Sequence, residues 1–93
     1  MGYRIELGEI ETAAGSLAGI DANACVYDME RDCIHLFYSG SIDEAALADG
    51  LAALVPNYMI PGDVHRLPAM PLNLNGKIDR TALKERVTNH EYA

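Results

Sequence analysis

Residues 72–80 read Leu-Asn-Leu-Asn-Gly-Lys-Ile-Asp-Arg, and this stretch combines a turn, a cation and the start of a helix. The Asn75-Gly76 pair is a strong turn signal, because both residue types tolerate positive φ angles. Lys77 follows directly, and its compact ammonium group suits a phosphate or carboxylate ligand. Asp79 is expected to cap a helix over residues 81–87. The stretch therefore predicts a lysine on a tight loop held by the helix behind it; the alternative is a surface lysine in an ordinary loop.

The same helix start carries a second signal. Ile78 precedes the expected cap and Leu83 falls at the fourth helical position, which is the spacing of a hydrophobic staple. A staple packs these two side chains together and fixes the angle at which the chain enters the helix. We therefore expect the loop to be anchored at its C-terminal end.

The composition is that of a folded domain without a nucleic-acid partner. The 93 residues are 49% hydrophobic and 23% charged, which fits one small globular domain or a piece of a larger protein. The 14 acidic residues exceed the 7 Lys and Arg and give a net charge of −7, so no basic patch is expected. No apolar run approaches membrane-spanning length and the start resembles no signal peptide. We expect a soluble, cytoplasmic protein with no membrane partner.

The cysteines and histidines follow no pattern typical of a disulfide scaffold or a zinc site. Cys25 and Cys33 are too few for a scaffold, and together with His35, His65 and His90 they make no zinc-site spacing. We expect two buried, reduced thiols, with a cross-strand disulfide as the alternative, and no metal site. His35 is interpreted as a solvent-facing strand residue, because no Ser or Cys nucleophile is placed to partner it.

A first helix is predicted near the N-terminus. Glu6, Glu9 and Glu11 in its first turns are interpreted as a solvated face that matches the helix dipole, in preference to an acid/base pair. Gly19 is the expected stop. The helix itself is indicated by apolar residues that recur at three- and four-residue steps: Leu7, Ile10, Ala14 and Leu17.

Strands and a second helix fill the middle of the chain. Residues 23–27 and 33–38 are β-forming runs joined by a short polar segment, typical of a hairpin, and residues 63–67 form a third strand. Ser41 and Glu44 give a capping-box pattern for the second helix. This order of elements predicts an α+β domain with a small three-stranded sheet and flanking helices. The buried face of the second helix is expected to carry four side chains: Leu47, Leu51, Leu54 and, near its end, Tyr58.

Three stretches together resemble the adenylate-forming (AMP-binding) enzymes. Residues 2–11, Gly-Tyr-Arg-Ile-Glu-Leu-Gly-Glu-Ile-Glu, are similar to the eighth core motif of that family. Residues 54–61, Leu-Val-Pro-Asn-Tyr-Met-Ile-Pro, are similar to the ninth, and residues 75–80 to the tenth. By this resemblance residues 1–93 are the C-terminal lid subdomain, without the large N-terminal domain. Residues 6–9 and 58–61 resemble the amino-acid-activating branch, which includes the adenylation domains of nonribosomal peptide synthetases and the D-alanine:carrier-protein ligases.

The resemblance implies a function for the whole enzyme. Members of the family use ATP and Mg²⁺ to convert a carboxylate into an acyl-adenylate, and pass the acyl group to the phosphopantetheine thiol of a carrier protein or of coenzyme A. The C-terminal subdomain rotates between these half-reactions. Lys77 matches the lysine that reaches the adenylate phosphate and the substrate carboxylate, and Gly2 and Arg4 match positions near the pantetheine channel. ATP and Mg²⁺ are expected mainly on the large N-terminal subdomain, so this chain alone is expected to be inactive. The alternative is a stand-alone acidic α+β interaction module without a catalytic role.

Overall fold

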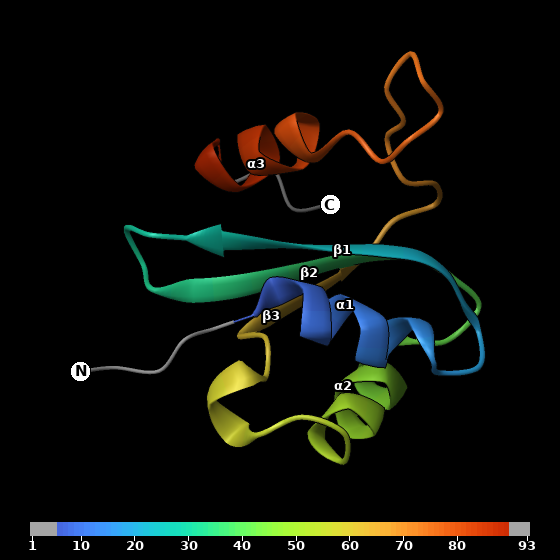
Figure 1. Cartoon of the computed structure of the whole chain (residues 1–93), viewed down its shortest axis with the longest axis vertical. Helices are drawn as coiled ribbons and strands as arrows, with labels where there is room; N and C mark the ends of the chain where they lie inside the picture. Colours follow the sequence, from blue (N-terminus) through green and yellow to red (C-terminus); the bar gives the residue numbers. More distant parts are fainter. Residues whose placement is uncertain (1–5, 90–93) are drawn as a thin grey trace.

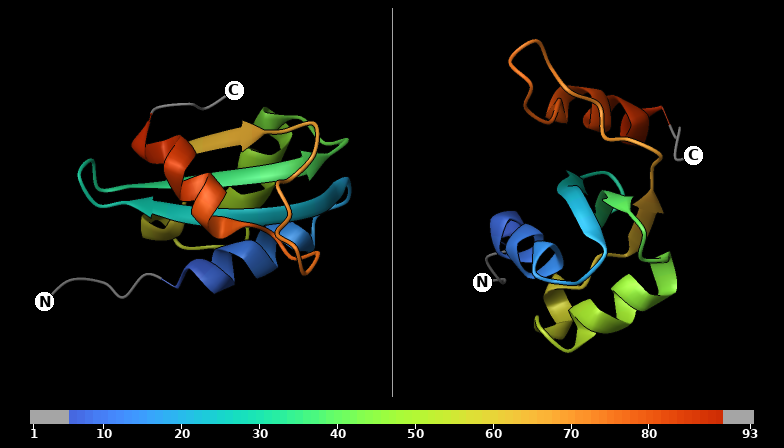
Figure 2. Two further views of the ribbon diagram at one scale, coloured as in Figure 1. Left: turned by 90° about the horizontal axis from the view of Figure 1, so that it is seen from above. Right: turned by 90° about the vertical axis from the view of Figure 1, so that its right-hand side faces the viewer.

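The computed structural model describes residues 6–89 and confirms the expected α+β architecture (Figure 1). The strands form one sheet in the order β1-β2-β3, in which β1 is antiparallel and β3 parallel to β2. Helices α1 and α2 lie on one face of this mixed sheet and α3 on the other (Figure 2). No described helix is long and apolar enough to cross a membrane. The elements in chain order are α1 (Leu7–Gly15), β1 (Ile20–Asp28), β2 (Cys33–Gly40), α2 (Glu44–Ala52), the 3-10 helix η1 (Asn57–Met59), β3 (Asp63–Arg66) and α3 (Arg80–Thr88).

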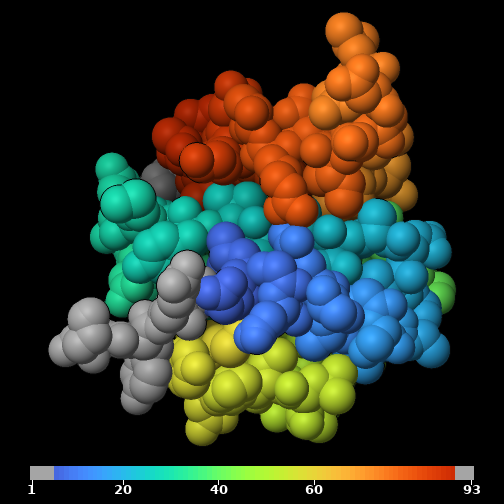
Figure 3. All heavy atoms as spheres, viewed as in Figure 1, coloured from blue at the N-terminus to red at the C-terminus, as the bar shows by residue number. Residues whose placement is uncertain are grey.

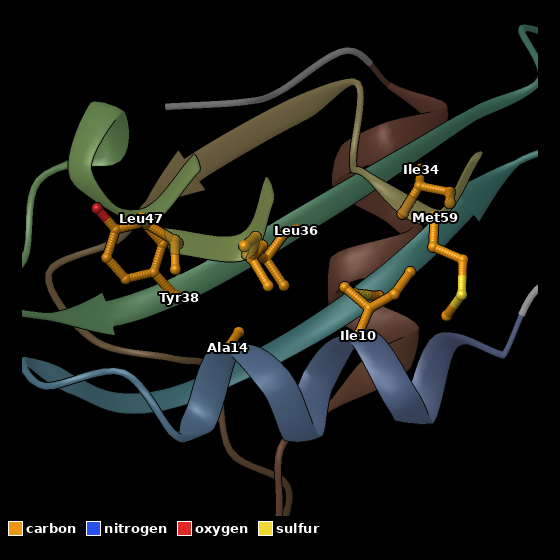
Figure 4. Packing of buried hydrophobic residues seen from close by; sticks show 9 residues of the cluster. Ile10, Ala14, Ile34, Leu36, Tyr38, Leu47 and Met59 are labelled. Carbon is orange, nitrogen blue, oxygen red and sulfur yellow. The ribbon is translucent and has the colours of Figure 1, made fainter. Parts of the chain in front are cut away.

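The central strand β2 divides the hydrophobic core into two clusters, because successive strand residues point to opposite faces of a sheet. Leu36 and Tyr38 point toward α1 and α2, where they meet Ile10, Leu47 and other apolar side chains (Figure 4). The Tyr38 hydroxyl donates a hydrogen bond of 2.7 Å to the Ile42 carbonyl, so this buried phenol has a partner. The opposite cluster is formed by Ala24, Val26, Phe37, Leu67, Met70, Leu83 and Val87.

The β1–β2 hairpin is confirmed and is longer than predicted at both strands. Helix α1 ends at Gly15, before the expected stop, and the Ser16 hydroxyl donates to the Ala13 carbonyl at 2.7 Å in its last turn. Gly19, at φ +94°, instead turns the chain into β1. A Cβ on Gly40 would lie 2.0 Å from the Gly19 carbonyl oxygen. The close crossing of the two strand ends therefore requires glycine at position 40.

The second helix begins differently from the predicted capping box. Its N-cap is Asp43, whose carboxylate accepts a hydrogen bond of 2.7 Å from the Ala46 amide. The Glu44 carboxylate accepts from the Arg66 amide at 2.9 Å, and so joins α2 to β3. The assignment of Ser41 as the cap was wrong, because Asp43, an equally good capping residue, directly precedes the first helical residue.

The second helix is also shorter than predicted. It ends at Ala52, so Leu54 and Tyr58 lie outside it and are 52% and 42% exposed instead of buried. Pro56 disfavours helical angles at the residue before it, so the helical stripe cannot continue to Tyr58. Met59 in η1 is the side chain that enters the core from this segment (Figure 4).

His35 is buried, which corrects the expectation of a solvent-facing position. Its side chain lies on the same face as Phe37 and is 1% exposed. The ring stacks against His65 of β3, with centroids 5.3 Å apart, and His35 Nδ1 lies 3.0 Å from His65 Nε2. The sheet has helices on both faces, so a polar residue in the central strand is covered whichever way it points.

Candidate functional site

The lysine loop, residues 71–79, is a small hairpin that projects from the domain on the α3 side (Figure 3). An isolated antiparallel bridge joins Leu72 and Ile78 near its base. The Asp79 amide donates to the Pro71 carbonyl at 2.8 Å, and the Asn73 amide donates to the Lys77 carbonyl at 2.8 Å. These bonds connect the two arms of the loop at successive levels, so the loop is ordered by its own backbone.

The Asn73 side chain organises the tip of this loop, a role that the sequence analysis missed. Its carboxamide oxygen accepts hydrogen bonds from the Asn75 amide at 2.9 Å and the Lys77 amide at 3.1 Å. An Asn side chain that bonds to the backbone two residues later is the signature of an Asx turn. The predicted turn is confirmed at Gly76, which has φ +78°, whereas Asn75 does not have a positive φ angle.

Lys77 lies in the C-terminal arm of the loop, and its side chain is exposed. Within residues 6–89 the structure gives its ammonium group no ion pair or hydrogen bond. The backbone of Lys77 is held on both sides, through its amide and its carbonyl. The arrangement thus presents a cation with a fixed backbone and an available head group.

Helix α3 anchors the C-terminal end of the loop as predicted. The Asp79 carboxylate accepts from the Ala82 amide at 3.1 Å and caps the helix. Ile78 and Leu83 both pack in the cluster beneath α3, which agrees with the expected staple. Arg80, the residue after the cap, reaches across the sheet to Glu11 of α1.

Arg80 forms a two-bond ion pair with Glu11 of α1. The distances from its Nη1 and Nη2 to the Glu11 oxygens are 2.7 and 3.1 Å. Glu11 also accepts from the Cys25 amide at 2.7 Å, so one carboxylate connects α1, β1 and α3. The hydrogen bonds to Glu11 raise the pKa of Arg80. Burial, and to a smaller extent the Glu11 charge, raises the pKa of Cys25 to about 12. The interpretation of Glu11 as part of a solvated face was therefore wrong, while Glu9 is exposed as predicted.

Parts of the first and second motif-like stretches meet on the other side of the sheet. Residues 8–16 of α1 and its continuation and residues 54–59 line a groove of about 650 Å³. Leu54 and Tyr58 stand half exposed beside it. The lysine loop lies across the sheet from this groove (Figure 1). Gly2 and Arg4, the predicted thiol-channel residues, lie outside the described residues.

Both cysteines are free, so the alternative of a disulfide was wrong. Cys25 pairs with Leu36 and Cys33 with Asp28 in the β1–β2 register, which separates the two sulfurs along the hairpin. Cys25 is buried in the cluster beneath α1 and α2, whereas Cys33 is only partly buried.

Comparisons with known proteins identify homologous segments in much longer chains. No protein-family model matches the chain. It is 39% identical, over 88% of its length, to the isonitrile lipopeptide synthase of Mycobacterium tuberculosis, and 37% identical, over 98%, to tyrocidine synthase 3 of Brevibacillus parabrevis. It spans only 4% and 2% of these two proteins.

A solved structure connects the sequence relation to the fold. A four-domain nonribosomal peptide synthetase bound to AMP and glycine is 34% identical and superposes with a TM-score of 0.75. The match covers 87% of this chain and 6% of that protein. The resemblance of the three stretches is thus confirmed by sequence and by fold. The chain is a C-terminal subdomain of the adenylate-forming enzymes, related to the adenylation modules of nonribosomal peptide synthetases.

Proposed function

We propose that the chain is the mobile lid of an ATP-dependent ligase that activates an amino acid as an acyl-adenylate and transfers it to a phosphopantetheine thiol. The observation that carries the proposal is Lys77: an exposed ammonium group without an ion-pair partner among residues 6–89, on a loop that its own backbone orders. A preorganised cation is most effective where negative charge develops in a transition state. Among residues 6–89, Lys77 offers such a group from the C-terminal arm of a projecting loop.

In this proposal Lys77 acts in the first half-reaction. The substrate carboxylate attacks the α-phosphate of ATP, an acyl-adenylate forms, and pyrophosphate leaves. The Lys77 ammonium contacts the carboxylate and phosphate oxygens and offsets the charge that gathers on them. Gly2 and Arg4 are assigned to the thiol channel of the second half-reaction, on the strength of the motif resemblance.

Magnesium does not fit the lysine loop. Lys77 is a cation and cannot be a ligand. The Asp79 carboxylate already accepts a hydrogen bond from the Ala82 amide, because it caps α3. Mg²⁺ needs oxygen ligands in octahedral arrangement. We therefore assign Mg²⁺ and most contacts to ATP to a large N-terminal subdomain, supplied by the same polypeptide or by a partner chain. The half-exposed Leu54 and Tyr58 are apolar side chains that such a subdomain would cover.

The thiol acceptor is a carrier protein or coenzyme A. The synthetase relatives favour the carrier protein, because the chain is 37% identical to a segment of tyrocidine synthase 3 and 34% identical to a segment of the solved four-domain nonribosomal peptide synthetase. The specificity for the acyl group resides in the pocket of the large subdomain. Because ATP and Mg²⁺ are assigned mainly to the large subdomain, this chain alone should catalyse neither half-reaction.

A segment exchange tests the proposal. This chain replaces the homologous segment of an adenylation module of tyrocidine synthase 3, and ATP–pyrophosphate exchange is measured. The chimera should be active, and Lys77→Ala should lower exchange about 10²–10³-fold. Lys84→Ala is the matched control, because Lys84 is an exposed lysine on α3 outside the loop. A chimera that assembles normally but shows no exchange would support the interaction module instead. A chimera equally active with and without Lys77 would contradict the role given to Lys77.

A further inference from the structure

Three side chains with metal-binding atoms meet where strands β2 and β3 run side by side. The parallel register places Asp63 beside His35, and Cys33, two residues before His35, shares its face of the sheet. Asp63 Oδ2 lies 3.8 Å from Cys33 Sγ and 3.7 Å from His35 Nδ1. All three donor atoms lie within 4.8 Å of one another. A thiol, an imidazole and a carboxylate therefore converge on one point.

We propose that Cys33, His35 and Asp63 form a Zn²⁺ site in which water is the fourth ligand. Sulfur, nitrogen and carboxylate oxygen are the three donor types that zinc accepts, and hard ions such as Mg²⁺ avoid the sulfur. Bonds of about 2.3 Å to sulfur and about 2.0–2.2 Å to nitrogen and oxygen give ligand–ligand separations of roughly 3.3–3.6 Å in a tetrahedron. The two distances to Asp63 Oδ2, 3.7 and 3.8 Å, need to close by a few tenths of an ångström. All three donor atoms lie within 4.8 Å of one another, so the separation of the sulfur from the imidazole nitrogen closes by at most about 1.5 Å when the ion binds.

The backbone around the sulfur leaves room for this geometry. A Cβ on Gly62 would lie 2.7 Å from Cys33 Sγ, so the absence of a side chain there accommodates the thiol. Cys33 and Gly62 also line a surface cavity of about 310 Å³, which gives an ion a path to the sulfur. His35 is 1% exposed and Asp63 is 53% exposed, so the site has a buried wall and an open side where water can bind.

Charge and protonation are compatible with an entering cation. A Cys33 thiol must give up its proton to ligate a metal ion. Zn²⁺ replaces that proton, which leaves to solvent, and sulfur then donates its lone pair to the ion. The net charge of −7 favours the approach of a divalent cation. His35 Nδ1 also lies 3.0 Å from His65 Nε2, so an ion bound at Nδ1 replaces this contact between the two rings.

This inference concerns a part of the molecule that the proposed ligase function does not use. The cluster lies where β2 and β3 begin, and Lys77 lies on the projecting loop before α3. The sequence spacing concealed the site, since Asp63 comes from a strand that is distant along the chain and becomes a neighbour only through the parallel pairing.

Cobalt(II) is the probe that tests the site on the full chain. Co²⁺ should give the near-ultraviolet charge-transfer band of a cobalt–thiolate bond, together with the intense visible bands of tetrahedral coordination, and Zn²⁺ should displace them. Cys33→Ser should abolish the charge-transfer band. Cys33→Ser should also lower the affinity for Zn²⁺ by about 100-fold, because losing a ligand costs at least as much as losing a residue that supports one. Competition with a chromophoric chelator measures this affinity.

Two further variants separate loss of a ligand from loss of the fold. Asp63→Asn changes an exposed carboxylate and should lower the affinity for Zn²⁺ by about 10–100-fold. Its circular dichroism spectrum should be unchanged, which shows that the fold is intact. Cys25→Ala removes the other thiol and should leave the cobalt–thiolate band intact. The proposal is overturned if wild-type protein gives no such band, if the band survives Cys33→Ser, or if Asp63→Asn binds Zn²⁺ as tightly as wild type.

Discussion

The sheet and the lysine loop are ordered in opposite ways. Leu36 and Phe37 of β2 are 0% exposed, and each belongs to a different one of the two apolar clusters. In the loop, Leu72 and Leu74 are 61% and 106% exposed. The loop is held by backbone hydrogen bonds and by the Asn73 side chain. Burial thus supplies the stability of the domain, and the loop is free to serve a ligand because it contributes little to the core.

The two regions are connected at one junction. Asp79 caps α3 directly after the loop, and Arg80 reaches Glu11 on the opposite helix layer. Glu11 in turn holds the Cys25 amide of β1. The loop therefore extends from a helix whose first turn is fixed to both the sheet and α1, so its base is rigid although its tip is exposed.

The largest effect is expected in the core. Phe37→Ala removes a fully buried ring and should lower the free energy of unfolding by about 3–5 kcal/mol. Leu74→Ala in the loop should change it by less than about 0.5 kcal/mol, because that side chain already lies in solvent. Urea denaturation of the two variants measures both values. Similar losses would show that the loop is part of the cooperative core.

A smaller effect is expected at the junction. Glu11→Ala leaves the Cys25 amide without its acceptor and breaks the pair with Arg80, and should lower the free energy of unfolding by about 1–3 kcal/mol. Glu11→Gln keeps an oxygen for the amide and should cost less. Urea denaturation at low and high salt compares the two, with Glu9→Ala as the exposed control on the same helix. If Gln at position 11 destabilises as much as Ala, the charge pair matters more than the amide bond.

The smallest effect is expected at the helix cap. Asp79→Ala removes the acceptor for the Ala82 amide and should lower the free energy of unfolding by about 1 kcal/mol. Asp79→Ser, which retains a capping oxygen, should recover most of that loss. Hydrogen exchange at the first turn of α3 provides the local readout. Unchanged exchange in Asp79→Ala would mean that the staple of Ile78 and Leu83 alone holds the helix start.

Features set by neighbouring residues were predictable from the sequence. The turn at Gly76, the cap at Asp79 and the hairpin depend on local backbone preferences, and all are present. The apolar stripe of α1 was also predictable, because Ile10 and Ala14 recur with the helical period and are buried. Asn73 was missed although its signal was available, since an Asn two residues before another turn residue favours an Asx turn.

Features set by distant residues were not predictable in this way. His35 was assigned to solvent because one strand does not reveal how many layers cover it, and β2 proved to be central with helices on both sides. Glu11 was assigned to a solvated face because its partner Arg80 lies at the other end of the chain. The position of Asp63 beside His35 depends on a parallel pairing that no local pattern specifies.

The central claim is that the available cation on the lysine loop serves adenylate formation. Single-turnover assays of the two half-reactions, made on a ligase that contains this chain, test it most directly. Lys77→Ala should slow adenylation about 10²–10³-fold, or ~3–4 kcal/mol, and should slow transfer from preformed acyl-adenylate to the thiol much less. Arg4→Ala should show the reverse pattern, and Lys84→Ala should change neither step. Equal slowing of both half-reactions by Lys77→Ala and by Arg4→Ala would contradict the claim and leave Lys77 a structural role.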